Sequence, residues 1–164
     1  EYLEIIKKLK KINPSIKFSS DFIIGYPGET HDDFEKTVEL MKKVEFINSY
    51  SFIYSARPGT PAFNLKKIND IIAKERLTVF QNISKKVKTE YRETLLTKTM
   101  PVLFENRTKD KNKYFGRDEY FNSVIVESNE NLTGKIKQIK ITKVNQNTLF
   151  GEISSNLIYK DFAA

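Results

Sequence analysis

The chain has 164 residues, 39% hydrophobic and 30% charged, which is enough for one ordinary domain or two small ones with a packed core. It contains no cysteine, which excludes disulfides and any cysteine-ligated iron–sulfur cluster held by this chain alone. The net charge of +7 and pI near 9.4 favour a polyanionic partner, although a basic surface can also serve solubility alone.

The sequence shows neither a membrane span nor a signal peptide. No apolar stretch approaches the roughly 20 residues that a span needs, so we expect a cytoplasmic protein without a membrane partner. The chain begins with Glu1-Tyr2, without Met, in what reads as the middle of a helix. We therefore expect it to be part of a longer polypeptide.

The first half alternates helical and strand patterns. Tyr2, Ile5 and Leu9 fall at helical spacing, and Asn13-Pro14 ends that helix. The segments that follow are predicted as a strand at 16–24, a helix at about 31–45 and a strand at about 49–54. This α-β-α-β order is typical of a parallel sheet with crossover helices. Two strands cannot close a barrel, so we expect residues 1–98 to be the C-terminal piece of one.

The second half changes to strands. A loop at 55–69 and a long helix at about 70–98 come first, and the period becomes two after Pro101. Strands are predicted at 102–105, 124–127, 134–144 and 149–153, separated by polar loops that include 109–113 and 128–132. Four or five short strands within residues 99–160 fit a small antiparallel barrel of OB-like size.

The corner after the first strand is a candidate ligand site. Phe22-Ile23-Ile24 reads as a buried strand that stops at Gly25, and Pro27-Gly28 predicts a tight turn before a helix capped by Thr30. Ligands of α/β proteins lie at the carboxyl ends of strands, where this turn falls. We expect Glu29 to accept hydrogen bonds from nearby backbone N–H groups and so to fix the turn. An ordinary βα turn explains the same pattern.

The corner after the second strand presents an arginine. Pro58 stiffens the segment Ser55-Ala56-Arg57-Pro58-Gly59, so Arg57 is displayed on a rigid support at a strand end. Its guanidinium suits a carboxylate, a phosphate or a stacked base, but it also suits a plain surface loop. His31 and the neighbouring Asp32 and Asp33 are interpreted as polar helix-start residues, and we predict no catalytic or metal-ligating residue.

The second half combines basic and aromatic residues. Lys135, Lys137 and Lys143 alternate with isoleucines and are predicted to share an outer face, whereas Lys140 breaks the alternation and indicates a bulge or a register change. Further basic and aromatic residues are expected in or beside loops: Arg107, Phe115, Arg117, Tyr120 and Phe121. This mixture suits RNA backbone contact and base stacking, or a solubilising face over core aromatics.

Two segments carry a family resemblance. Residues 19–30, SSDFIIGYPGET, and 50–62, YSFIYSARPGTPA, resemble the radical SAM methylthiotransferases, and the resemblance continues through Gly116-Arg117 to Gly151-Glu152. These segments most resemble the MiaB-type branch, which adds a methylthio group to carbon 2 of isopentenylated adenosine beside the tRNA anticodon. The tail resembles a TRAM domain, an RNA-binding barrel. Arg-Pro-Gly-Thr at 57–60 favours RNA over protein as substrate.

The resemblance implies cofactors, partners and site residues. The cofactors are S-adenosylmethionine and 4Fe-4S clusters, ligated by cysteines outside this chain, and the partners are the tRNA anticodon stem-loop and the missing N-terminal portion of the same polypeptide. The implied cofactor-binding residues are Asp21, Ile23, Gly25, Pro27, Gly28, Glu29 and Tyr54. The implied RNA-binding residues are Ser55, Arg57, Arg107, Arg117, Asn122, Lys135, Lys137 and Lys143.

Two alternatives remain at this point. The chain could be a stand-alone RNA-binding module, or it could belong to the branch that modifies threonylcarbamoyladenosine. In the methylthiotransferase interpretation, the chain supplies part of the cofactor wall and the tRNA contact but cannot catalyse alone.

Overall fold

The computed structural model describes residues 1–110 and 112–154. The chain divides into two compact units, Glu1–Glu90 and Tyr91–Ala164. Within the described residues, no helix is long and apolar enough to cross a membrane.

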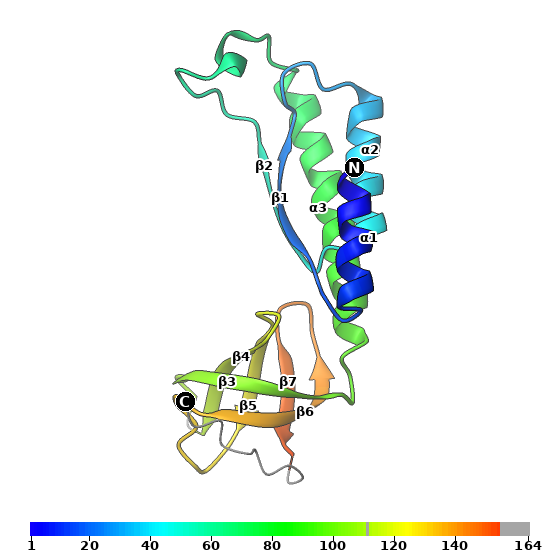
Figure 1. Ribbon diagram of the computed structural model, residues 1–164. Coiled ribbons are helices and arrows are strands. Elements are labelled where there is room, and N and C mark those ends of the chain that lie inside the picture. Colours follow the sequence, from blue (N-terminus) through cyan, green and yellow to red (C-terminus); the bar gives the residue numbers. More distant parts are fainter. Residues whose placement is uncertain (111, 155–164) are drawn as a thin grey trace. The chain divides into compact units, whose positions relative to one another are not determined.

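The first unit is a parallel strand pair packed on helices. Its elements are α1 (Tyr2–Ile12), β1 (Ser19–Ile24), α2 (His31–Val44), β2 (Asn48–Ile53), a short 3-10 helix η1 (Pro61–Asn64) and α3 (Asp70–Glu93), whose last residues enter the second unit. β1 and β2 pair in parallel from Ser19 opposite Asn48 to Ile24 opposite Ile53. The predicted α-β-α-β order is confirmed, and Figure 1 shows the three helices on one side of the two strands.

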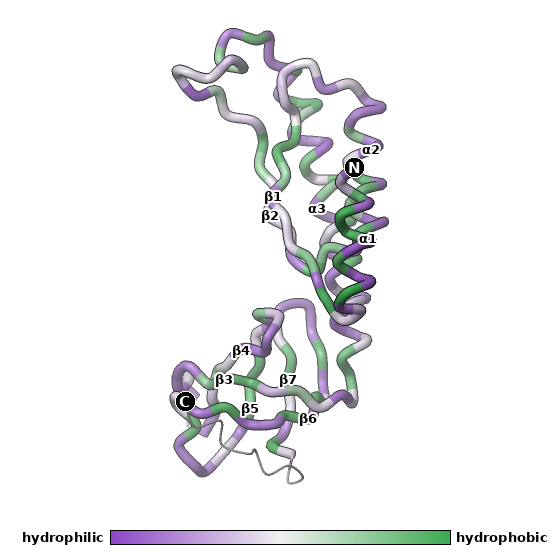
Figure 2. The backbone as a smooth tube through the Cα atoms, in the orientation of Figure 1, coloured by the Kyte–Doolittle hydropathy of each residue, from purple (hydrophilic) through white to green (hydrophobic). Residues whose placement is uncertain are grey.

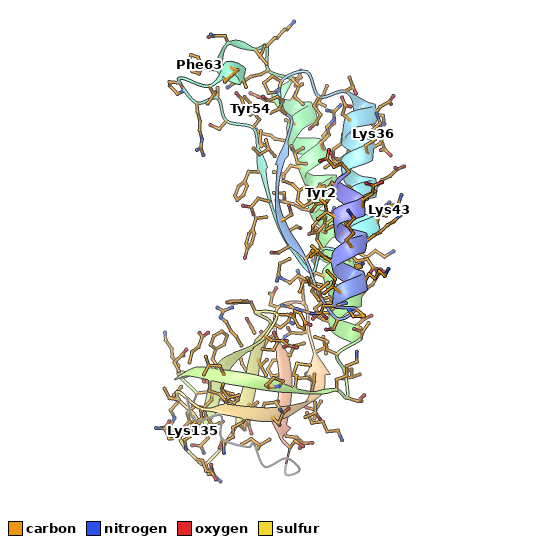
Figure 3. All side chains as sticks on the ribbon, in the orientation of Figure 1. Tyr2, Lys36, Lys43, Tyr54, Phe63 and Lys135 are labelled. Atoms are coloured by element: carbon orange, nitrogen blue, oxygen red, sulfur yellow. The ribbon has the colours of Figure 1, made fainter. Side chains whose placement is uncertain are left out.

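The core of this unit lies between the strands and the helices. Phe22 packs edge-on against Phe46, with ring centroids 5.4 Å apart, and its ring centroid is 4.7 Å from that of Phe80 of α3. α2 contributes four buried residues at helical spacing, which are Phe34, Val38, Met41 and Val44. The opposite face of α2 is polar, and Figure 3 shows Lys36 and Lys43 pointing away from the strands.

Thr30 caps α2 as predicted. Its hydroxyl accepts a hydrogen bond from the Asp33 backbone N–H, and the Asp33 carboxylate accepts one from the Thr30 backbone N–H. This reciprocal capping box satisfies two N–H groups that a helix start otherwise leaves unpaired. The helix therefore begins at the residue after Thr30.

Two predicted boundaries are corrected. The first strand begins at Ser19 rather than at 16, because the Asn13 carboxamide accepts a hydrogen bond from the Ser15 N–H and holds a turn. α3 ends at Glu93 rather than near 98. Thr97 has φ +67, outside the helical region, and Leu95 is buried in the core of the second unit.

The second unit is a closed five-stranded barrel. Its strands are β3 (Thr99–Arg107), β4 (Lys113–Asp118), β5 (Ser123–Glu127), β6 (Ile136–Val144) and β7 (Leu149–Ile153), in the order β3-β4-β5-β7-β6 with β3 paired to β6. A small antiparallel barrel of four or five strands was expected, but not the parallel β5–β7 pair. This strand order, with its one parallel pair, has the topology of an OB-fold.

β4 was missed by sequence analysis. Phe115 and Arg117 were placed in or beside a loop, whereas both lie in this strand. Gly116 is required because β3 runs close by: a Cβ there would lie 2.5 Å from the Leu103 carbonyl oxygen. A glycine is typical of loops, but Gly116 instead marks a close approach between the paired strands β3 and β4.

The barrel core is built by alternation. Inward positions such as Val102, Phe104, Val124, Ile139 and Ile141 are almost completely buried, and Figure 2 shows hydrophobic positions recurring along the strands. The pairing of β6 with β7 shifts register between Ile141 and Lys143. The bulge that the lysine pattern predicted thus falls at Thr142 rather than at Lys140.

Candidate cofactor wall and nucleic-acid interface

The turn after β1 is fixed by one carboxylate. The Gly25 N–H donates to Glu29 Oε2 at 2.9 Å, as predicted, and Arg76 Nη1 of α3 lies 2.7 Å from Glu29 Oε1. Both side chains are nearly buried, with 9% of Glu29 and 13% of Arg76 exposed. The Arg76 guanidinium also lies 5.6 Å from the centroid of the Phe34 ring. Glu29 therefore holds the turn onto α3, and sequence analysis missed Arg76 because its partner is 47 residues away.

The glycines of this corner have different surroundings. Gly25 has φ +75 and is buried, and a Cβ there would lie 3.0 Å from the Ala73 Cβ. Ala73 of α3 fills the space that a Cβ at Gly25 would occupy, so packing already requires a glycine there, and its contact with a cofactor stays a prediction. Gly28 has φ +83, and nothing lies within 4 Å of its Cβ position. Of these two glycines, Gly28 is therefore the one with open space beside it, while Pro27 next to it is buried.

One face of the β1–β2 pair is open. Ile23 is 58% exposed, and its register partner Phe52 is also 58% exposed. Tyr50, 62% exposed, lies opposite the exposed Asp21 on the same face. Sequence analysis did not single out Tyr50 and Phe52. The pattern that could have identified them is the alternation of Tyr50 and Phe52 with Ser49 and Ser51. Because Ser49 faces α3 and shares a hydrogen bond with Ser84, the alternate residues Tyr50 and Phe52 point to the opposite face.

The second corner lies at the same edge of the strand pair. Tyr54 follows β2, its N–H donates to the Ile24 carbonyl at 2.9 Å, and its ring packs edge-on against Tyr26 at 5.2 Å. Ser55 is exposed. The Arg57 carbonyl accepts a hydrogen bond from the Thr60 hydroxyl at 2.8 Å, which fixes the loop ahead of η1. Within the described residues the exposed Arg57 guanidinium has no hydrogen-bond or ion-pair partner. Figure 3 shows Tyr54 at this end of β2 and Phe63 on η1.

The barrel carries a row of apolar side chains on its outer face. Phe115 of β4 lies opposite Ile125 of β5, which lies opposite Phe150 of β7, and Lys143 of β6 lies opposite Phe150. All three apolar residues are half-buried and alternate with buried neighbours, so they point away from the core. The row Phe115–Ile125–Phe150 had no sequence signal as a unit, because it depends on the parallel β5–β7 pair.

The predicted basic residues do not share one face. Arg117 lies 5.2 Å from the centroid of the Phe115 ring and pairs with Glu105 at 3.0 Å. Lys137 lies opposite the buried Val102, on the inward parity of β6, and its Nζ is 4.0 Å from Glu130. The predicted common face for Lys135, Lys137 and Lys143 is therefore corrected.

The other predicted basic residues lie in and around the loops. Arg107 at the end of β3 donates to Asn112 at 3.1 Å, and Lys135 is exposed just before β6. Figure 3 shows Lys135 extending from the barrel.

Asn122 has a positioning role. It is only 2% exposed, and its side chain and backbone N–H both donate to the buried Asp118 carboxylate at 2.8 Å. Tyr91 and Arg92 at the end of α3 lie near this carboxylate. Burial raises the pKa of Tyr91 to about 12, and the Asp118 charge acts in the same direction. Burial lowers the pKa of Arg92, and here the Asp118 charge acts in the opposite direction. Asn122 therefore shapes the β4–β5 turn instead of facing solvent.

The residues of this chain do not fit an iron–sulfur cluster. The sequence contains no cysteine, and within the described residues no group of three or more His, Cys, Asp or Glu could hold a metal. The open β1–β2 face is different in character, because its exposed apolar and aromatic side chains fit an adenine-containing ligand.

The family comparisons agree with the fold. Residues 93–154 match the TRAM domain family, whose match covers all five strands of the barrel. The chain is 49% identical over 156 residues to the tRNA-2-methylthio-N(6)-dimethylallyladenosine synthase of Pelagibacter ubique (strain HTCC1062), covering 95% of this chain and 35% of that protein. Proteins of the same name from Wolbachia pipientis wMel and Rickettsia conorii (strain ATCC VR-613 / Malish 7) are 41% and 42% identical, covering 92% and 93% of this chain and 35% of each relative.

These matches confirm the predicted resemblance. The chain is related in sequence to the tRNA methylthiotransferases that make 2-methylthio-N(6)-dimethylallyladenosine, and neither the stand-alone module nor the threonylcarbamoyladenosine branch is favoured. The chain spans about a third of the length of the curated relatives it matches.

Proposed function

We propose that this chain forms part of a methylthiotransferase that modifies carbon 2 of isopentenylated adenosine beside the tRNA anticodon. Residues 1–98 supply the last βα units of a radical SAM barrel, and residues 99–160 supply the TRAM domain that contacts tRNA. The parallel register of β1 and β2 carries this proposal, because it brings both glycine-and-proline corners to one edge of the sheet.

In this proposal the open sheet face lines the S-adenosylmethionine site. Ile23 would hold the adenine, Gly28 leaves room at the turn, and Glu29 with Arg76 holds the turn in place. Arg57, on its braced loop, is available to a carboxylate of the cofactor or to a tRNA phosphate. Bound S-adenosylmethionine and the 4Fe-4S clusters supply the radical and sulfur-transfer chemistry, with cluster ligands from outside this chain.

The activity is tested by deleting the gene that encodes the chain and analysing tRNA nucleosides by mass spectrometry. We expect the 2-methylthio form to disappear and the isopentenylated adenosine without it to accumulate. Complementation with Ile23→Glu should not restore the methylthio group, whereas Lys42→Glu on the exposed face of α2 should restore it. Persistence of the modification in the deletion strain contradicts the proposal.

The dependence on ligands outside the chain has its own test. We expect the chain to form no stable cluster when incubated with iron and sulfide under reducing conditions, because it offers no thiolate. A stable cluster with radical-generating activity in the chain alone overturns this part of the proposal.

A further inference from the structure

The outer row of the barrel combines rings and cations in an order that suits unpaired nucleotides. Phe115, Ile125 and Phe150 form a continuous apolar strip across three adjacent strands. Arg117 lies over the Phe115 ring at one end, and Lys143 Nζ lies 6.0 Å from the centroid of the Phe150 ring at the other. The strip therefore offers two rings, each flanked by a cation, and the Arg117 guanidinium is oriented by its ion pair with Glu105.

A hollow adjoins this strip. It has a volume of about 320 Å³ and is lined by Ile125 and Phe150 together with four residues of the β3–β4 loop and the start of β4: Thr108, Lys109, Asp110 and Lys113. This volume lies at the low end of the range for small-ligand sites, about 300–1,000 Å³. Lys113 Nζ is 3.0 Å from the Asp110 carboxylate, which raises the pKa of Lys113 and keeps it charged. The hollow thus has an apolar floor, a carboxylate that can accept hydrogen bonds from base amino groups, and lysines for the backbone.

The fold places this strip where OB-folds bind oligonucleotides. β4 and β5 are the second and third strands of the barrel, and the β3–β4 loop is the loop between its first and second strands. The chain's net charge of +7 complements a polyanion.

The spacing of the two rings distinguishes unpaired from paired bases. Phe115 and Phe150 are separated by two strand spacings, about 10 Å. Successive bases in a duplex strand are about 3.4 Å apart and present only their edges to a protein. Bases must therefore be splayed out of a helix before they can stack on both rings.

We propose that Phe115 and Phe150 form a stacking surface for two unpaired bases of an RNA loop, with Ile125 between them and Arg117 and Lys143 on the flanking phosphates. The proposal rests on the proposed contact of the barrel with tRNA and adds the binding face and the single-stranded character of the bound segment.

The test uses the complete chain and two labelled RNAs, a short single strand and its blunt duplex, titrated by fluorescence anisotropy. Phe115→Leu and Phe150→Leu keep an apolar side chain but remove the ring, which limits the risk of unfolding. Tyr2→Leu is the matched control, because Tyr2 is 47% exposed and lies on α1, outside the barrel. Phe150→Tyr is the rescue variant, since it restores a ring. Circular dichroism verifies that every variant is folded.

We expect the single strand to bind more tightly than the duplex. Each ring-to-leucine change in the row should weaken single-strand binding on the order of 5- to 100-fold, and the control and rescue variants should bind like the unchanged chain. Equal binding of single strand and duplex, or unchanged affinity in both row variants, overturns the stacking surface while leaving RNA binding intact. Failure of the unchanged chain to bind either RNA instead overturns the proposed tRNA contact of the barrel.

Discussion

Glu29 and Arg76 tie the turn after β1 to α3 through an ion pair of 2.7 Å, and the other Glu29 oxygen accepts the Gly25 N–H at 2.9 Å. One nearly buried carboxylate thus satisfies a backbone donor and a guanidinium together. Removing either partner leaves the other without compensation in a site from which water is largely excluded.

We therefore expect Glu29→Ala and Arg76→Ala each to lower the free energy of unfolding of the first unit by about 3 kcal/mol. The double variant should lose less free energy of unfolding than the sum of the two single variants, because the second change no longer leaves a buried charge without a partner. Urea unfolding followed by circular dichroism at helical wavelengths measures this, since the helices lie mainly in the first unit. The exposed neighbour Glu75→Ala serves as control and should change stability by less than about 0.5 kcal/mol. Additive losses from Glu29 and Arg76 would show that the two side chains act independently.

The glycines of the same turn form a matched pair. Both have positive φ, but a Cβ at Gly25 meets Ala73 at 3.0 Å, whereas a Cβ at Gly28 meets open space. Gly28→Ala should cost only the backbone strain, roughly 1 kcal/mol, and Gly25→Ala should cost more because α3 must also move. Thermal unfolding of the two variants compares the costs. Equal losses would mean that the Ala73 contact relaxes freely.

The cap of α2 has a pH dependence with a definite sign. Hydrogen bonds from Thr30 lower the pKa of Asp33 below its ordinary value of 3.8. The folded chain therefore binds this proton more weakly than the unfolded chain, so the contribution is present above about pH 4 and is lost as the pH falls through the lowered pKa. Thr30→Ala should cost about 1 kcal/mol at neutral pH. Unfolding of the Thr30→Ala and unchanged chains across this acid range should show the difference shrinking as the pH falls.

Asn122 should behave as a positioning residue. Its buried side chain donates to Asp118, so Asn122→Ala leaves a carboxylate oxygen without that donor and should destabilise the barrel by about 1–3 kcal/mol. At a temperature where the variant is folded, its affinity for single-stranded RNA should be unchanged. Loss of affinity without loss of stability would indicate that Asn122 contacts RNA.

The salt dependence of RNA binding tests the cation beside Phe150. If Lys143 neutralises one phosphate, Lys143→Gln should reduce the slope of log K against log salt by about 0.7. Lys43→Gln, on the exposed face of α2, removes the same charge elsewhere and should leave the slope unchanged. Equal slopes for the two variants would place the phosphate contact away from Lys143.

Local chemistry made much of the fold predictable. Phe22-Ile23-Ile24, Pro27-Gly28 and Thr30 specify strand, turn and helix start over a few residues, and each of these elements is present. Glu29 was correctly assigned to the turn because its acceptor role is local. β4 was missed because the glycine in it, Gly116, is required by the close approach of Leu103 on β3, which the local sequence does not show.

The candidate sites were less predictable, because they depend on distant pairings. Arg76 acquires its role only when α3 packs against the turn. The row Phe115–Ile125–Phe150 exists only because β5 and β7 pair in parallel, which no local pattern in either strand encodes. Lys137 was expected on the outer face of its strand and Asn122 was expected to bind RNA. The barrel turns Lys137 toward the position of Val102 and buries Asn122 in the β4–β5 turn, and no local pattern in either segment shows this.

Pairing of β3 with β6 completes the ring of strands, so every strand of this barrel has two neighbours. Within the part of the chain that the structure describes, the closed ring leaves no strand with an unpaired edge, and a partner therefore cannot join these five strands by adding another. Whatever binds this domain is recognised by its side chains and loops, so exchanging a few outward residues can change the ligand while the backbone stays the same.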